Sequence, residues 1–131
     1  PRLQFVCANA LEYPLPESDA FILNDILHYM NYEHQRTLLL RCMERLRPEG
    51  KLIVRDGNAA NTRKHRLTRF TELLSTGIFS FNKTTEQLCF TSEAQIRSIA
   101  QEGGMQLEIL PNDRYTSNTI YIFQKNKPEH E

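Results

Sequence analysis

Residues 18–57 read SDAFILNDILHYMNYEHQRTLLLRCMERLRPEGKLIVRDG, and this stretch decides the fold. The apolar runs 20–23 and 51–54 have the length of buried strands, and the segment between them repeats apolar residues at helical spacing. Asn31 is suited to cap the start of a helix. This helix should end near Leu46, because a proline and a glycine closely follow that residue. Strand, helix and strand with short connections predict a right-handed parallel crossover unit.

The rest of the chain extends this pattern on both sides. Residues 3–7 (LQFVC) form another apolar run of strand length, and residues 92–103 have the spacing of a helix. Residues 105–110 and 119–123 are separated by a polar turn, which predicts an antiparallel hairpin. We therefore expect an α/β sheet that is parallel for most of its strands and is closed by a C-terminal antiparallel hairpin.

Residues 58–90 interrupt the pattern, because they are too numerous for an ordinary connection in a compact domain. We expect a cap insertion here, with a helix over roughly residues 63–74. The apolar side of this helix could belong to the core or shape an apolar acceptor pocket. The tail 126–131 is polar, and we expect it to be solvated.

Composition bounds the class of protein. The chain has 131 residues, 40% hydrophobic and 24% charged, with a formal net charge of zero, which is typical of one globular domain. A zero net charge favours neither nucleic acid nor an anionic membrane as a partner. No apolar run has the length of a membrane span.

The cysteines and histidines indicate no disulfide and no metal. Cys7, Cys42 and Cys89 lie far apart in the sequence, which favours free thiols in a reducing compartment, and we expect a cytoplasmic protein. The four histidines have no ligand spacing with these cysteines, so we assign no metal site.

Three motifs follow one another in a meaningful order: FVCANALEYPLP at 5–16, FILNDILHY at 21–29, and RLRPEGKLIV at 45–54 with an Asp-Gly pair just after it. In this order and spacing the chain resembles the class I S-adenosylmethionine-dependent methyltransferases. The resemblance covers residues 3–57 well and residues 92–125 as a helix plus hairpin. It implies a Rossmann-like methyltransferase sheet, with residues 1–131 as a partial domain that lacks the N-terminal strand–helix units and the glycine-rich cofactor loop.

The resemblance assigns cofactor-binding roles to residues at strand ends. The residue after the third strand of the family contacts the adenine amino group, and Asn9, followed by Ala10, matches that position. An asparagine keeps the carbonyl acceptor that such a contact needs, but it could instead only cap a turn. Asn24 and Asp25 match the stretch that passes beside the methionine part of the cofactor.

The resemblance also implies an acceptor site. His28 could act as general base toward an acceptor hydroxyl or amine, or it could only pack and hydrogen-bond to the backbone. Asp56 follows a strand and could line the acceptor pocket or make a surface ion pair. Arg63 and Arg66 belong to a basic cluster that could bind an anionic group of a substrate or form a solvated helix face.

Two functions follow. The first is S-adenosylmethionine-dependent methyl transfer to a small-molecule acceptor, with this chain as part of a longer parent protein. We then expect a strand and a G-x-G-x-G loop about 60 residues before Pro1, and weak or no cofactor binding by the chain alone. The second is a non-catalytic methyltransferase-like module that forms a homodimer or another assembly through an exposed apolar sheet edge.

Overall fold

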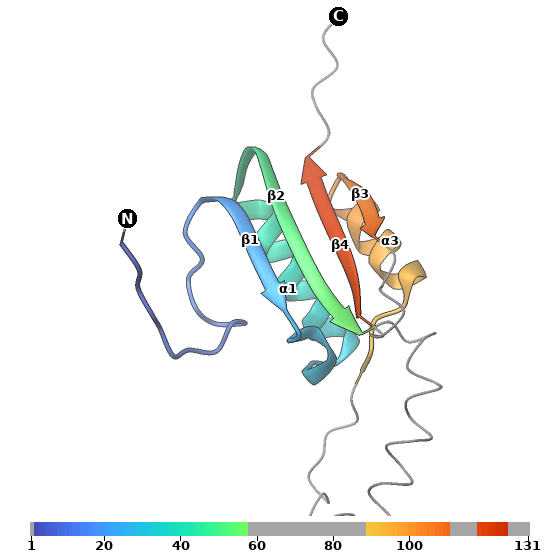
Figure 1. Cartoon of the computed structure of the whole chain (residues 1–131), viewed down its shortest axis with the longest axis horizontal. Helices are drawn as coiled ribbons and strands as arrows, with labels where there is room; N and C mark the ends of the chain where they lie inside the picture. The colour runs from blue at the N-terminus through green and yellow to red at the C-terminus, as the bar shows by residue number, and fades with distance from the viewer. Residues whose placement is uncertain (1, 58–88, 111–117, 126–131) are drawn as a thin grey trace, which may run out of the picture.

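A four-stranded mixed sheet forms the centre of the computed structural model, which describes residues 2–57, 89–110 and 118–125 (Figure 1). The strands lie in the order β1-β2-β4-β3. Their bounds are β1 Ser18–Asn24, β2 Leu46–Gly57, β3 Met105–Leu110 and β4 Asn118–Lys125. The strands predicted at 20–23, 51–54, 105–110 and 119–123 all form, and β1, β2 and β4 extend beyond the predicted bounds.

The pairing of the strands confirms the α/β class and the C-terminal hairpin. β1 and β2 are parallel, with Ile22 opposite Ile53, and this pair is the parallel part of the described sheet. β2 pairs antiparallel with β4, and β4 pairs antiparallel with β3, so that Phe123 lies between Leu52 and Leu107. Since β1 and β2 are parallel, their carboxyl ends meet at one edge of the sheet.

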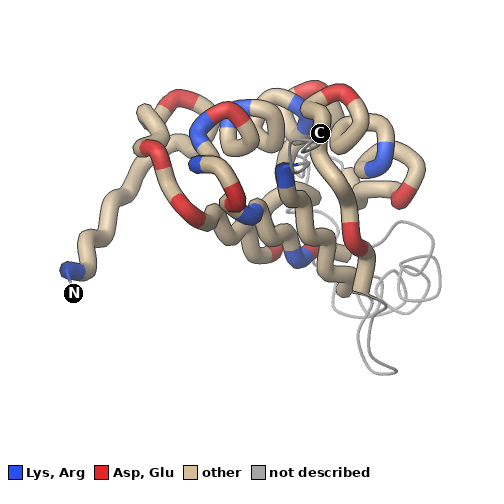
Figure 2. The backbone as a smooth tube through the Cα atoms, turned by 90° about the horizontal axis from the view of Figure 1, so that it is seen from above, with Lys and Arg blue, Asp and Glu red and all other residues tan. Residues whose placement is uncertain are grey.

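Helices α1 (Tyr32–Arg45) and α3 (Glu93–Glu102) lie on the same side of the sheet (Figures 1 and 2). The side chain of Asn31 caps α1 by accepting a hydrogen bond from the backbone N–H of His34. Ser92 caps α3 in the same way through the N–H of Gln95. The predicted helix boundaries are therefore confirmed, and their physical cause is the capping residue at each N-terminus.

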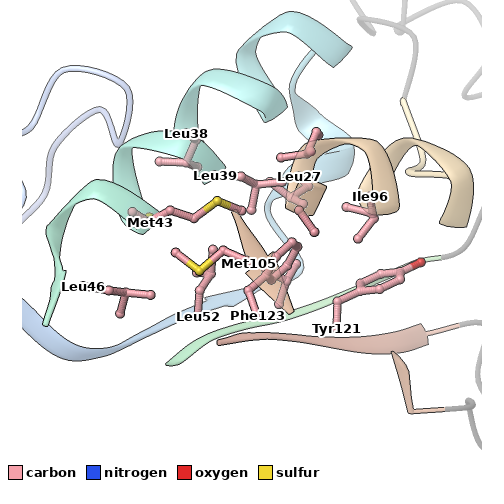
Figure 3. Close-up of a cluster of buried hydrophobic side chains, with 14 residues drawn as sticks. Leu27, Leu38, Leu39, Met43, Leu46, Leu52, Ile96, Met105, Tyr121 and Phe123 are labelled. Atoms are coloured by element: carbon pink, nitrogen blue, oxygen red, sulfur yellow. The ribbon is translucent and has the colours of Figure 1, made fainter. Parts of the chain in front are cut away.

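The core lies between the two helices and the sheet face that they cover (Figure 3). The apolar residues of each helix recur about every 3.6 residues, so they lie on one face of the helix. They point at alternate residues of β2 and β4, because every second side chain of a strand lies on the same face of the sheet. The largest fully buried apolar side chains are Tyr121, Phe123, Leu27, Leu38, Leu39, Leu52, Ile96 and Val54.

The strand predicted at residues 3–7 does not form. These residues lie in an extended segment without strand pairing, in which Leu3 is 87% exposed and Phe5 is 92% exposed. A strand needs a hydrogen-bonded neighbour, and no described strand pairs with this segment. Apolar composition alone therefore predicted a strand for which the described residues offer no pairing partner.

Two predicted segments lie outside the described residues. Most of the expected cap insertion, 58–88, and the tail 126–131 belong to them, and so do Arg63 and Arg66. Cys89 and Phe90, the last residues of the expected insertion, are described. In the described part of the chain, no helix is both long enough and apolar enough to cross a membrane.

Candidate functional site

Asp56 is the centre of a hydrogen-bonded cluster at the carboxyl end of β2. Its side chain is fully buried. One carboxylate oxygen accepts from the backbone N–H of Leu27 at 2.7 Å, and the other accepts from the backbone N–H of Gly57 at 2.8 Å. That second oxygen also lies 2.7 Å from Nδ1 of His28. A buried carboxylate with this set of donors is fixed in one orientation.

His28 belongs to a single turn of 3-10 helix, η1 (Leu27–Tyr29), which directly follows β1. A carboxylate in this pair is an acceptor, so Nδ1 carries the hydrogen and Nε2 is the nitrogen left with a lone pair. The ring of Phe90 stacks on the imidazole with a centroid distance of 5.3 Å, and the ring of Tyr29 lies 4.1 Å away. The side chain keeps 14% of its surface exposed.

This placement corrects the interpretation of Asp56. The sequence left a pocket-lining carboxylate and a surface ion pair open, and the side chain is neither, since it has no exposed surface. The carboxylate of Asp56 binds Nδ1 of the imidazole and, through the N–H of Leu27, fixes the turn that carries His28. The carboxylate of Asp56 thus orients the ring of His28 through the hydrogen bond at Nδ1.

Asn24 and Asp25 lie at the same edge of the sheet, where Arg55 engages both. Nη1 of Arg55 donates to Oδ1 of Asn24 at 3.1 Å and to the carboxylate of Asp25 at 2.9 Å. Asp25 has a φ of 56°, in the left-handed region, and its N–H donates to the Arg55 carbonyl at 2.8 Å. Because the side chains of Arg55 and Asp25 are each 41% exposed, their oxygens and nitrogens remain accessible to a ligand.

Asn9 and Ala10 lie in a turn that contacts α1. The side chain of Asn9 accepts from the N–H of Leu11 at 3.0 Å and closes a turn, which is the structural role that the sequence left open. Arg41 of α1 donates to the carbonyl of Ala10 at 2.8 Å. The described contacts thus join this turn to α1, and an adenine contact of Asn9 stays a prediction.

Sequence reasoning missed three contributors to this site. Phe90 was assigned only to the insertion, Arg55 was not separated from its neighbours, and Gln35 was not singled out. Gln35 is fully buried on α1, and its amide donates to carbonyls on both sides of the His28 turn. A polar residue at a core-facing position of a helix is the signal that could have identified it.

A cavity of about 580 Å³ lies elsewhere, at the opposite end of the sheet. Its lining residues are Leu40, Met43, Glu44, Glu102, Gly103, Gly104, Met105 and Lys125. None of them belongs to the cluster around Asp56. The chemistry at the strand ends is therefore the better guide to function than this cavity.

The comparison with protein families identifies the class. A model of the O-methyltransferase domain matches residues 1–106, so the chain belongs to the O-methyltransferase domain family. The resemblance to the class I S-adenosylmethionine-dependent methyltransferases is thereby confirmed, and S-adenosylmethionine is the cofactor of this family. Comparison with curated proteins gives no match.

Solved structures share the fold. An O-methyltransferase family protein from Burkholderia thailandensis is 21% identical with a TM-score of 0.65, and the match covers 96% of this chain and 36% of that one. Human N-acetylserotonin methyltransferase in complex with SAM is 18% identical with a TM-score of 0.63, covering 92% and 33%. An O-methyltransferase family 2 protein from Planctomyces limnophilus, in complex with apigenin, is 17% identical with a TM-score of 0.65, covering 91% and 33%. The chain thus spans about a third of the length of these three proteins.

Proposed function

We propose that residues 1–131 form the C-terminal part of an S-adenosylmethionine-dependent methyltransferase that methylates a hydroxyl group of a small molecule. The observation that carries the proposal is the 2.7 Å contact between His28 and the buried carboxylate of Asp56 at the carboxyl ends of the parallel strands. In open α/β sheets, ligands bind just beyond the carboxyl ends of the strands. Membership of the O-methyltransferase domain family supports oxygen as the acceptor atom.

In the proposed reaction, Nε2 of His28 accepts the proton of the acceptor hydroxyl as the oxygen forms its bond to the methyl carbon. The bound cofactor would supply the methyl group on a sulfonium, and its sulfur would take up the electron pair of the carbon–sulfur bond. Asp56 stabilises the resulting imidazolium through Nδ1. Phe90 covers one face of the ring and limits the access of water to it.

Part of the cofactor site fits residues of this chain. Oδ1 of Asn24 and the carboxylate of Asp25 are acceptor oxygens at the strand end next to His28, which suits the cationic end of the cofactor. Arg55 holds both oxygens in place and offsets part of the charge of the Asp25 carboxylate. Asn9 and Ala10 are proposed for the adenine, and Arg63 and Arg66 for an anionic group of the acceptor.

Binding of S-adenosylhomocysteine tests the proposal. Calorimetric titrations would compare the 131-residue chain with a longer form that extends about 60 residues upstream, which is the size of two strand–helix units. Binding by the longer form alone is the expected result. If both forms are folded and neither binds, the methyltransferase proposal fails. A count of reduced thiols in cells would test the proposed cytoplasmic location, for which the free Cys7 and Cys42 are the support.

The exposed outer strand of the sheet supports a second candidate function, a module that associates with itself. β1 is an outer strand of the described sheet, and the side chain of Ile22 on it is 70% exposed. The apolar side chains of Leu3, Phe5 and Val6 are also exposed. An edge of this kind can pair with a strand from another chain. Sedimentation velocity separates the candidates, because a stable dimer without cofactor binding would favour the module, and a monomer would exclude it.

A further inference from the structure

Gln35 makes an unusual set of hydrogen bonds in the interior of the protein. Its side chain is fully buried on the first turn of α1. Nε2 lies 2.8 Å from the carbonyl oxygen of Leu27, 3.0 Å from that of Met30 and 2.7 Å from that of Cys89. One amide therefore joins the helix to the turn after β1 and to the segment that leads into α3.

The chemistry of these partners fixes the orientation of the amide. All three neighbours are carbonyl oxygens, which accept hydrogen bonds. The amide nitrogen can donate to them, whereas the amide oxygen in the same place would repel them. Two N–H hydrogens serve three acceptors, so at least one bond is shared. Oε1 of Gln35 has no hydrogen-bond partner among the described residues.

The segments that Gln35 joins are those that hold His28. Leu27 and Met30 lie on either side of the His28–Tyr29 pair in the chain. The N–H of Cys89 donates to the carbonyl of His28 at 2.9 Å, and the next residue stacks its phenyl ring on the imidazole. Gln35 thus fixes the backbone that carries the imidazole and the backbone that carries its stacking partner.

We propose that Gln35 is the positioning residue of His28, which sets the ring against Asp56 so that one nitrogen faces the carboxylate and the other faces the acceptor. Asp56 fixes the ring from the side of β2, and Gln35 fixes the turn from the side of α1. A general base must be placed within hydrogen-bond reach of the proton that it accepts. This inference rests on the proposed role of His28, but the placement of the ring can be measured without any reaction.

Two variants test the inference. Gln35→Met keeps the length of the side chain and removes both donors. Gln35→Glu keeps the shape and sets a carboxylate oxygen against three carbonyl oxygens, so its effect should be larger. Gln101→Met is the matched control, because Gln101 is an exposed glutamine on α3.

The first measurement is the nitrogen-15 NMR spectrum of the histidine rings in the printed chain. The wild type and Gln101→Met should hold His28 in the single tautomer with hydrogen on Nδ1, and both Gln35 variants should lose it to a mixture. Circular dichroism checks that each variant is folded. A retained single tautomer in folded Gln35 variants would overturn the proposal. Failure of both variants to fold would also overturn it, since Gln35 would then be required for the fold as a whole.

The second measurement is methylation by the full-length protein. We expect kcat to fall by about 10- to 100-fold with KM little changed, by analogy with residues that orient metal-binding histidines. Loss of the single tautomer together with this loss of kcat would support both the inference and the proposed function. Loss of the tautomer with unchanged kcat would keep the positioning role and refute the proposed role of His28.

Discussion

Nδ1 of His28 lies 2.7 Å from Oδ1 of Asp56, although 28 residues separate the two in the sequence. The contact depends on the parallel pairing of β1 and β2, which brings both strand ends to one edge. The carboxylate has no exposed surface, and the imidazole has little. An interaction with an ionised group is stronger where water is excluded, so this pair is the natural starting point for mutations.

If the proposed function is right, replacement of His28 should abolish most of the methyltransferase activity of the proposed longer protein. In His28→Ala no group remains at this position to accept the hydroxyl proton, and general bases contribute about 10²- to 10⁴-fold to rates. Initial rates of methyl transfer at saturating cofactor measure the effect. His34→Ala is the control, because the side chain of His34 is exposed at the start of α1. Equal rates for the two variants would refute the role of His28.

Replacement of Asp56 should reduce stability as well as activity. Asp56→Ala leaves the buried N–H of Leu27 and the N–H of Gly57 without their acceptor, and each buried donor left unpaired costs roughly 1–3 kcal/mol. Urea denaturation of the printed chain measures the loss. Asp19→Asn is the control, since the side chain of Asp19 is 80% exposed, and we expect less than about 0.5 kcal/mol there.

The sequence was sufficient for the elements whose cause is local. The cap of Asn31, the apolar spacing of α1 and the alternation in β3 each depend on neighbouring residues, and each prediction was confirmed. The prediction of a strand at residues 3–7 was wrong, because a strand forms only where a second strand, distant in the sequence, pairs with it. The sequence also singled out His28 and Asp56 separately, but their contact follows from the register of two strands.

The thiol of Cys42 should be inert in the folded protein. Burial raises its pKa from 9.0 to about 11, so the thiolate is scarce at neutral pH. The pKa of Cys42 is raised by folding, so the contribution of this thiol to stability is constant below about pH 9 and is lost as the pH rises from about 9 to about 11. Denaturation at a series of pH values checks this, with Cys42→Ala losing that part of the slope. At pH 8 iodoacetamide should modify the exposed Cys7 long before Cys42.

The two adjacent glycines after α3 should respond differently to alanine. A Cβ on Gly103 would lie 2.3 Å from Sδ of the buried Met43, so Gly103→Ala must displace that side chain. A Cβ on Gly104 would meet nothing within 4 Å, but φ is +68° there, and alanine costs about 1 kcal/mol in this region. Overpacking costs typically about 1–3 kcal/mol.

A second change separates the two causes. Shortening Met43 to alanine should reduce the effect of Gly103→Ala and leave the effect of Gly104→Ala unchanged, because only the first is a steric contact. Thermal denaturation of the double variants gives both coupling energies. Equal coupling of Met43 to the two glycines would show that the steric explanation is wrong.

Arg41 should determine whether the turn around Asn9 stays folded. Its guanidinium donates from Nη1 to the carbonyls of Ala10 and Leu11 and from Nη2 to that of Tyr13. Arg41→Lys keeps the charge but loses the planar fork that reaches all three oxygens at once. We expect the amides of Glu12 and Tyr13, which donate to the Asn9 carbonyl, to exchange with solvent at least about tenfold faster, since one hydrogen bond to a charged group is worth roughly 1.5–3 kcal/mol.

Hydrogen exchange followed by NMR resolves this effect residue by residue. The control is Arg47→Lys, because Arg47 makes only an exposed ion pair with Asp19 among the described residues and such pairs contribute little. The amides of α1 should keep their protection in Arg41→Lys, since the helix is capped independently by Asn31. Unchanged exchange at Tyr13 would mean that the turn is held by Asn9 itself, and loss of protection throughout α1 would mean that Arg41 supports the helix more than the turn.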